Sequence, residues 1–326
     1  MSSGLFYGLG AAFAWGLTDV TAALGARRYG SLRVVVVTQL LGVVALTLVL
    51  AASLAAGADA PTLDGRSVAI AAICGFVACL TYLAFFTALR IGPITVVSPA
   101  VSAYGGLTVV LAVLLRGESM TLLQAAGALV STAGVVLVSL RLDGGLRSAR
   151  PVGPGLGFAL VALVGFAALT VTMADPIRSI GWLPALIVSR GTNAALGAGL
   201  LAFALARPSR RFDPFLSGGD QVAAPALVAV PGVVAAPGVV AAHHVLRSAA
   251  MAVVLAGLLD VAGLVSFGIG LETSLVWLVG LASSFGPVAA VIVAVQFLGE
   301  RPRPIQWLGI VAIATGIVLI GLDRSG

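Results

Sequence analysis

The sequence predicts an all-α integral membrane protein with ten transmembrane helices in two inverted five-helix repeats. The first observation is composition: 60% of the 326 residues are hydrophobic, 9% are charged, and the mean hydropathy is +1.14. Soluble domains carry about 25% charged residues. The second observation is a series of apolar runs near the roughly 20 residues that cross a bilayer. The third is an internal repeat in the chain.

Ten apolar runs follow one another, and turn or stop residues such as Gly92-Pro93 and Asp175-Pro176 separate most of them. The first run begins close to the N-terminus and lacks the basic flank of a cleaved signal peptide. The predicted spans are residues 4–24, 33–56, 67–89, 94–115, 121–140, 154–174, 182–206, 247–271, 274–297 and 304–322.

Several function classes find no support in the composition. The net charge of +6 is scattered through the loops, which argues against nucleic-acid binding. Cys74 and Cys79 lie in one apolar run and suggest neither a disulfide framework nor a metal site, and His243-His244 is a weak metal signal. Phosphate-cradling and nucleophile-elbow motifs are absent from the sequence. We therefore expect no enzyme activity, no ATP hydrolysis, no metal and no cofactor.

The repeat emerges when the chain is shifted by 182 residues. Arg116-Gly117-Glu118 then falls on Leu298-Gly299-Glu300 without gaps, and further glycine and glutamine matches follow downstream. The two predicted halves, residues 1–145 and 146–326, hold five spans each. Because five is odd, the second copy must enter the membrane from the opposite side, which is the inverted repeat found in many secondary transporters.

An inverted repeat can open a central site to either side of the membrane in turn. The expected function is therefore secondary transport of a small metabolite or drug-like solute by alternating access, as an exporter or exchanger, with proton coupling as an open option. Two alternatives remain: a flippase for a lipid-linked intermediate, and a membrane subunit that transports nothing.

The ends of the two halves resemble a known family. The pattern Gly117-Glu118-x5-Gln124-x2-Gly127, followed by Gly134, occurs again from Gly299-Glu300 to Gly316. Together with ten spans, this pattern resembles the EamA-type family of the drug/metabolite transporter superfamily. The resemblance implies ten helices around a central cavity, a multi-pass position in the cell membrane, and export or exchange of small metabolites. It names no substrate.

One region departs from this pattern. The connection at about 207–246 is longer than its counterpart at 57–66 and contains a tandem duplication, Pro-Gly-Val-Val-Ala-Ala, over residues 231–242. Residues 222–242 are apolar enough to imitate a span, but their prolines disfavour a regular helix. A loop or re-entrant segment is the preferred interpretation, and an eleventh span is the alternative.

Asp19 in span one is a candidate for cation or proton binding. An ionisable side chain inside the bilayer costs roughly 2.5–3.5 kcal/mol on insertion scales, so such residues are candidate functional groups. Trp15 lies one helical turn before Asp19, and an aromatic face beside a carboxylate can bind a cationic or zwitterionic solute. The alternative is an interfacial ion pair between Asp19 and Arg27 or Arg28 near the helix end.

Asp260 in span eight and Arg190 in span seven are the other ionisable residues clearly inside spans. Asp260 is distant from any loop, so it is expected to face the cavity or a buried partner. A role in the solute pathway and a structural hydrogen-bonded role both remain open. Arg190 is the natural counter-ion for a carboxylate, and its counterpart in the first half is near Gln39. A structural Arg190–carboxylate lock stands beside direct contact with the solute.

Polar side chains in spans three, four and nine are further candidates for lining a cavity: Tyr82, Ser102, Tyr104 and Ser284. In spans four and nine, neighbouring glycines and prolines can open the helix and free backbone groups for a solute. The alternative for the serines is that these small residues only allow close helix packing.

Gly117-Glu118 and Gly299-Glu300 each lie between two closely linked spans, just before a helix start. Thr121-x-x-Gln124 fits a capping box at the start of span five. The two carboxylates are therefore expected to brace helical hairpins and not to bind the solute.

The arginine distribution leaves orientation open. The connections after the odd-numbered spans hold 13 arginines, and the other side, with both termini, holds four. This bias puts the termini outside the cytoplasm, whereas the family resemblance implies cytoplasmic termini. The expected partners are a small-molecule solute, the lipid bilayer and, as an option, protons. The oligomeric state is open between monomer and homodimer.

Overall fold

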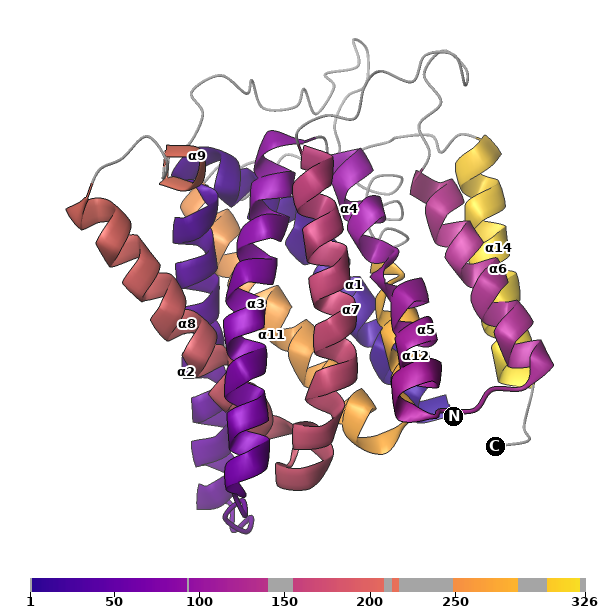
Figure 1. Ribbon diagram of the computed structural model, residues 1–326, viewed down its shortest axis with the longest axis horizontal. Coiled ribbons are helices and arrows are strands. Elements are labelled where there is room, and N and C mark those ends of the chain that lie inside the picture. The colour runs from indigo at the N-terminus through magenta and orange to yellow at the C-terminus, as the bar shows by residue number, and fades with distance from the viewer. Residues whose placement is uncertain are drawn as a thin grey trace, which may run out of the picture.

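The computed structural model describes residues 2–92, 94–139, 155–207, 213–216, 249–286 and 304–322. Across these ranges every regular element is a helix (Figure 1). The helices are α1 (Ser2–Tyr29), α2 (Ser31–Ala55), α3 (Gly65–Ile91), α4 (Ile94–Ser102), α5 (Tyr104–Arg116), α6 (Leu122–Ser139), α7 (Gly155–Ile180), α8 (Trp182–Ala206), α9 (Asp213–Leu216), α11 (Ala249–Thr273), α12 (Val276–Ser283) and α14 (Pro304–Leu322).

Six of these helices are long and apolar enough to cross a membrane: α1, α2, α3, α7, α8 and α11. Their outward faces carry large apolar side chains, for example Leu48, Ile73 and Val161 at 64%, 62% and 58% exposure. Such a surface is suited to contact with lipid, because the hydrocarbon core of a bilayer is as apolar as a leucine side chain. The all-α membrane fold is therefore confirmed. Residues 222–242, His243-His244 and the second part of the predicted span 274–297 lie outside the described residues.

The predicted span 94–115 is not one continuous helix. It is broken at Ala103 into α4 and α5, and α12 also ends early, at Ser283. Gly105 and Gly106 follow Tyr104, the first residue of α5. Glycine weakens a helix by about 0.5–1 kcal/mol relative to alanine. Gly105 also makes room for the second break, since a Cβ there would lie 2.6 Å from the Cβ of Ser284. The segment that follows the break at Ala103 therefore contacts the turn that follows α12.

Long helix pairs build the centre of the molecule. α1 packs along α11, α3 packs along α7, and α2 contacts α8. The buried face of α1 is rich in alanine, including Ala11, Ala22, Ala23 and Ala26, each fully buried. Small side chains let helix backbones approach closely in a membrane. We call the side with residues 56–64, 117–121 and 274–275 the lower face, as drawn in Figure 1.

α6 and α14 form a separate pair at one edge of the molecule (Figure 1). Glycines bring their backbones together: a Cβ on Gly127 would lie 2.8 Å from the carbonyl oxygen of Gly316, and a Cβ on Gly134 would lie 2.8 Å from that of Gly309. Real side chains essentially never approach a carbonyl so closely. The glycines that identify the repeat are therefore the contact points of this pair.

Gly127→Leu is expected to separate α6 from α14 and to lower the free energy of unfolding by about 1–3 kcal/mol, the usual cost of overpacking. Thermal unfolding of the detergent-purified protein measures the loss. Gly199→Leu on α8 is the matched control, because a Cβ there meets nothing within 4 Å. An equal loss in both variants would mean that leucine itself, and not the helix contact, is responsible.

Asp64 caps α3 and ties it to the end of α7. Its Oδ1 accepts the backbone N–H of Ser67 at 2.8 Å, and its Oδ2 accepts the hydroxyl of Ser179 at 2.8 Å. Hydrogen bonds from Ser67 and Ser179 lower the pKa of this exposed carboxyl from 3.8 to about 2. The charged form of Asp64 therefore stabilises the fold above about pH 4, and this contribution is lost as the pH falls toward 2.

Asp64→Ala is accordingly expected to reduce the dependence of the melting temperature on pH between about pH 4 and pH 2. A thermal shift series over this pH range measures the effect. Asp59→Ala, in the same exposed connection, serves as the control. A variant that keeps the full wild-type slope would show that other groups cause the acid sensitivity.

Candidate functional site

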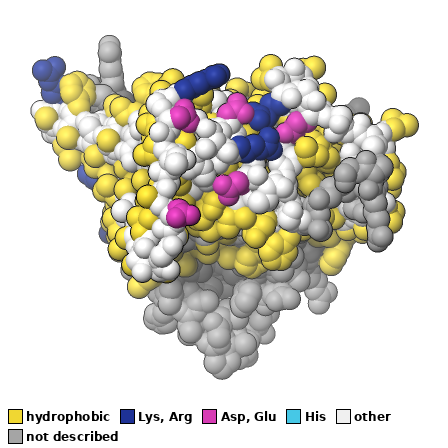
Figure 2. All heavy atoms as spheres, turned by 90° about the horizontal axis from the view of Figure 1, so that it is seen from below, with side chains coloured by type: hydrophobic (Ala, Val, Ile, Leu, Met, Phe, Trp, Pro, Cys, Tyr) yellow, Lys and Arg dark blue, Asp and Glu magenta, His cyan; other side chains and the backbone are white. Residues whose placement is uncertain are grey.

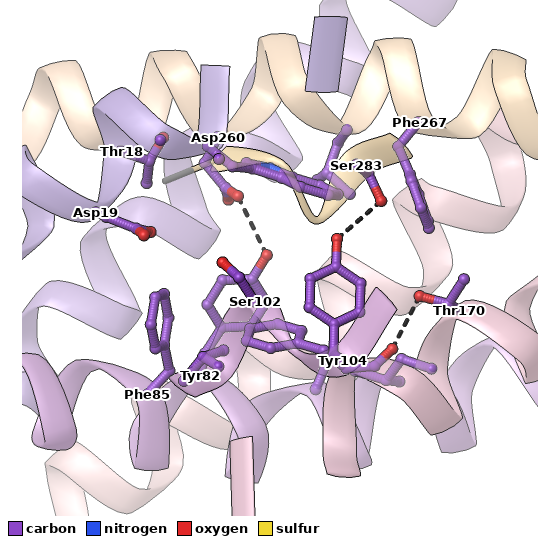
Figure 3. Close-up of a pocket in the computed structure, with 18 of the residues that line it drawn as sticks. Thr18, Asp19, Tyr82, Phe85, Ser102, Tyr104, Thr170, Asp260, Phe267 and Ser283 are labelled. Atoms are coloured by element: carbon purple, nitrogen blue, oxygen red, sulfur yellow. Dashed lines mark hydrogen bonds between the residues drawn. The ribbon is translucent and has the colours of Figure 1, made fainter. Parts of the chain in front are cut away.

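A central cavity of about 130 Å³ lies between α1, α3, α4, α5, α7, α8, α11 and α12 (Figure 3). Its lining includes seven of the eight residues predicted for binding or coupling: Trp15, Asp19, Tyr82, Ser102, Tyr104, Arg190 and Asp260. Ser284, the eighth, is not a lining residue. The structure therefore brings seven of the predicted residues together around one cavity. Their role in binding or coupling stays a prediction.

Arg190 and Asp260 form a buried ion pair on one side of the cavity. The Arg190 Nη2 lies 2.7 Å from the Asp260 Oδ2, and neither residue exceeds 4% exposure. The Tyr82 hydroxyl donates to the Asp260 Oδ1 at 3.1 Å and accepts from the Arg190 guanidinium at 3.1 Å. Arg190 also donates to the amide oxygen of Gln39. This arrangement neutralises both charges inside the protein, as the lock hypothesis expects.

Asp19 has a different environment. The hydroxyl of Ser98 donates a hydrogen bond to its carboxylate, which points toward the cavity (Figure 3). Asp19 is 8% exposed and makes no ion pair among the residues that the structure describes. The predicted alternative partner Arg27 instead donates to the backbone oxygen of Gly92 at 3.2 Å. Among the described residues, Asp19 is therefore the cavity carboxylate that has a hydroxyl partner and no cationic partner.

Aromatic side chains form much of the remaining wall. Phe166 of α7 lies against Phe85, Tyr82 and Tyr104, with ring centroids 5.6, 5.3 and 6.0 Å away. Across the cavity, Trp15 lies 5.2 Å from Phe267. Ring faces beside a carboxylate attract cations. The sequence did not single out Phe85, Phe166 or Phe267, because an aromatic residue in an apolar span has no local contrast.

The breaks in the helices supply hydroxyl groups to the cavity. The hydroxyls of Tyr104 and Ser283 are hydrogen-bonded at 2.8 Å, directly beside the α4–α5 break (Figure 3). Ser284 was expected here, but its hydroxyl turns back to the carbonyl oxygen of Leu281 at 2.7 Å, and the side chain packs on Gly105. Ser283 therefore occupies the position predicted for Ser284, because the tight turn after α12 rotates the second serine away.

The Gly117-Glu118 motif has a structural position, with one difference from expectation. Gly117 ends α5 in the left-handed region, at φ 64°. Glu118 accepts the backbone N–H groups of Val276 and Trp277 at 3.1 and 3.0 Å. It thus caps the start of α12, whereas we expected it to brace the α5–α6 hairpin. Gly299 and Glu300 lie outside the described residues.

The capping box at α6 forms as expected. The backbone N–H of Thr121 donates to the side-chain oxygen of Gln124 at 3.0 Å, and the N–H of Gln124 donates to the Thr121 hydroxyl at 3.2 Å. Within the described ranges, no group of three or more His, Cys, Asp or Glu side chains could hold a metal ion. Cys74 and Cys79 are buried free thiols.

Comparison with solved structures gives a likeness in fold. The chain is similar to a solved structure that is described only as a crystal structure of a protein. The TM-score is 0.67 and the sequence identity is 20%, and the alignment covers 99% of this chain and 97% of the other. Comparison with curated proteins finds no match. The family model of the EamA-like transporter family matches residues 2–140. The match covers less than half of the chain, and it supports the expected resemblance to the EamA-type family of the drug/metabolite transporter superfamily.

Proposed function

We propose that the protein is a secondary carrier of the cell membrane that moves a small solute by alternating access. Its two inverted five-helix halves are residues 1–145 and 146–326. The observation that carries this proposal is the central cavity, because its walls come from related positions of the two halves. The aromatic pairs Trp15–Phe267 and Phe85–Phe166 lie across the cavity from each other. Among the described residues, only the side with Trp15 carries a carboxylate without an ionic partner, Asp19.

Helix contacts support the inverted repeat. α1 packs on α11 as α7 packs on α3, and α2 contacts α11 as α8 contacts α3. Two further pairs join a helix to its own counterpart: α2 with α8, and α6 with α14. The members of these pairs run in opposite directions in Figure 1, as an axis in the membrane plane requires.

Local geometry supports the same relation. Gly30 and Gly181 are 151 residues apart, and both precede a 25-residue helix with φ at 86°. Arg27 donates to the carbonyl oxygen of Gly92 at 3.2 Å, and Arg178 donates to that of Ser274 at 2.6 Å. The two arginines are again 151 residues apart, and the two acceptors are 182 apart. Both arginines thus cap the end of the third helix of their own half.

The cavity follows these two offsets in position but not in chemistry. The Trp15–Phe267 pair corresponds to Phe166–Phe85, through offsets of 151 and 182 residues. The charged residues have uncharged counterparts: Thr170 for Asp19, Ala78 for Asp260 and Gln39 for Arg190. A symmetric framework therefore holds a one-sided set of charges. We infer that solute recognition depends on this asymmetry.

Charge within the cavity favours a cation at Asp19. Because Arg190 and Asp260 compensate each other, ionised Asp19 leaves one negative charge in a largely apolar space. A solute cation or a proton can neutralise that charge, and the adjacent ring faces add about 0.5–2 kcal/mol for a cation. Asp19 is thus the proposed group for recognition or proton coupling, and Asp260 is the proposed structural partner of Arg190.

Counterflow in liposomes tests the proposal. Purified protein is reconstituted without ATP, and small organic cations, zwitterions and neutral solutes are screened first by thermal stabilisation. A solute at 100 times its dissociation constant stabilises the fold by about 2.7 kcal/mol. A stabilising solute is expected to exchange across the membrane faster than in empty liposomes. Folded protein that exchanges no solute of any class would contradict the proposal.

A further inference from the structure

An exact inverted repeat would give its two access states equal free energy, because the symmetry operation converts one state into the other. Contacts present on only one side of the molecule make the two states unequal. The Arg27 and Arg178 caps are duplicated and lie within their halves, so they do not favour either state. Polar contacts that cross between the halves and lack a counterpart therefore identify a bias.

Arg116 makes such contacts on the lower face, where acidic and arginine side chains gather (Figure 2). Its Nη2 lies 2.8 Å from the Oδ1 of Asp175, and its Nη1 donates to the carbonyl oxygen of Val171 at 3.3 Å. Arg116 ends α5 in the first half, and both of its partners belong to α7 in the second half. Opening the lower face between α5 and α7 would break both contacts.

Glu118 extends the same connection. It lies beside Arg116, with 3.8 Å between the Arg116 Nε and the Glu118 Oε1, and it accepts the first backbone N–H groups of α12. We call Arg116, Glu118 and Asp175 the lower-face clasp. The clasp joins α5 to two helices of the other half. α5 begins at Tyr104, which lines the cavity, and ends at the lower face. α12 begins at the lower face and ends at Ser283, which also lines the cavity.

The packing beneath the cavity is correspondingly tight. Thr108 of α5 fills the space beside Gly280 of α12, where a Cβ would lie 2.4 Å from the Thr108 Cγ2. Trp277, one turn further toward the lower face, is fully buried. The clasp therefore lies at the lower end of the contact between α5 and α12. This contact separates the cavity from the lower face.

The sequence does not repeat the clasp on the opposite side. The position 182 residues after Arg116 is Leu298, and the position 151 residues before Asp175 is Leu24. Neither leucine carries a charge, so this ion pair has no symmetry-related copy. Glu118 does have a related carboxylate, Glu300, which makes the Arg116–Asp175 pair the distinctive part of the clasp.

We propose that the Arg116–Asp175 pair is a one-sided latch that holds the carrier in the state closed at the lower face. This inference rests on the proposed alternating access. The pair favours that state by the strength of a partly exposed ion pair, since Asp175 is 65% and Arg116 16% exposed in the side chain. Losing it is expected to raise the population open at the lower face by about two- to fivefold.

Cysteine accessibility tests the latch. Cys74 and Cys79 are replaced by alanine, and Ala78→Cys places one thiol on the cavity wall. A membrane-impermeant maleimide is applied to vesicles of each orientation, and the labelling rates from the two faces are compared. Arg116→Leu and Asp175→Asn are each expected to raise the rate from the lower face about two- to fivefold. The double variant is expected to equal the single variants, because the pair acts as one unit.

Arg66→Leu is the matched control, since Arg66 is an exposed arginine at the start of α3 on the same face. Its labelling rate is expected to stay at the wild-type value. Equal rates in the wild type and all variants, with labelling from both faces, would overturn the latch but leave alternating access intact. Labelling from one face only in every variant would contradict both. Asp175→Asn changes a largely exposed residue, so it decides the matter even where Arg116→Leu impairs folding.

Discussion

Asp260→Leu is expected to lower the free energy of unfolding by about 3–5 kcal/mol, because it leaves the buried guanidinium of Arg190 without its carboxylate. Arg190→Met is expected to cost a similar amount for the opposite reason. Thermal unfolding of the detergent-purified variants measures both losses. These are large fractions of a typical total stability of 5–15 kcal/mol.

The double variant, Arg190→Met with Asp260→Leu, separates a lock from a solute site. Replacing a whole buried ion pair by apolar residues is often neutral or stabilising, so most of the lost stability is expected to return. The hydroxyl of Tyr82 and the amide of Gln39 lose partners in this variant, so some cost remains. If each single variant were as stable as the wild type, the Arg190–Asp260 pair would have no structural role.

Asp19→Asn is expected to reduce exchange of a cationic solute at least tenfold, about 1.4 kcal/mol, with little change in the melting temperature. Asparagine retains an oxygen that can accept the Ser98 hydroxyl, but it carries no charge to neutralise a cation. In the wild type, binding is expected to weaken as the pH is lowered enough to protonate Asp19. The variant is expected to lose that pH dependence. Counterflow measured over a pH series tests both results.

Asp19→Glu and Asp59→Asn complete the experiment on Asp19. Asp19→Glu keeps the charge and is expected to recover part of the exchange, while Asp59→Asn removes an exposed loop carboxylate and is expected to change nothing. Thr170→Ala alters the position related to Asp19 in the second half, where no charge is lost. Unchanged exchange and unchanged pH dependence in Asp19→Asn would remove Asp19 from the mechanism.

The helices could be predicted from the sequence because apolar runs and helix-breaking residues fix their ends. The predicted span 182–206 coincides with α8, and 304–322 coincides with α14. Glycines and prolines near Ser102 and Tyr104 indicated that the helix could open in this region, but the position of the break at Ala103 could not be predicted, because it depends on the contact between Gly105 and the turn at Ser284. Such a contact joins residues 179 positions apart, and local propensity does not record it.

The candidate site could be predicted where burial is costly. Asp19, Arg190 and Asp260 attract attention because a charge in a span needs an explanation. Phe85 and Phe166 do not, because aromatic residues are ordinary in apolar helices. A second repeat offset could have found them: the first two helices of each half are related by 151 residues, not 182, since the longer connection at 207–246 shifts the register.

The partner of each charge was beyond sequence reasoning. Arg190 was open to pairing with either aspartate, and its pairing with Asp260 follows from the contacts of α8 and α11 around Tyr82. That choice leaves Asp19 as the carboxylate available for a solute. Three-dimensional packing therefore assigned different candidate roles to two residues that look equivalent in the chain.

The glycine contacts between α6 and α14 have a mechanical consequence. Carbonyl groups of one helix occupy the places where side chains would stand on the other, so this pair resists sliding and spreading. α6 belongs to the first proposed half and α14 to the second, so this pair joins the two proposed halves along one edge. In the proposed alternating access, rocking of one half against the other is expected to pivot at this edge. The largest displacements are expected at the far edge, where α2 and α8 meet (Figure 1).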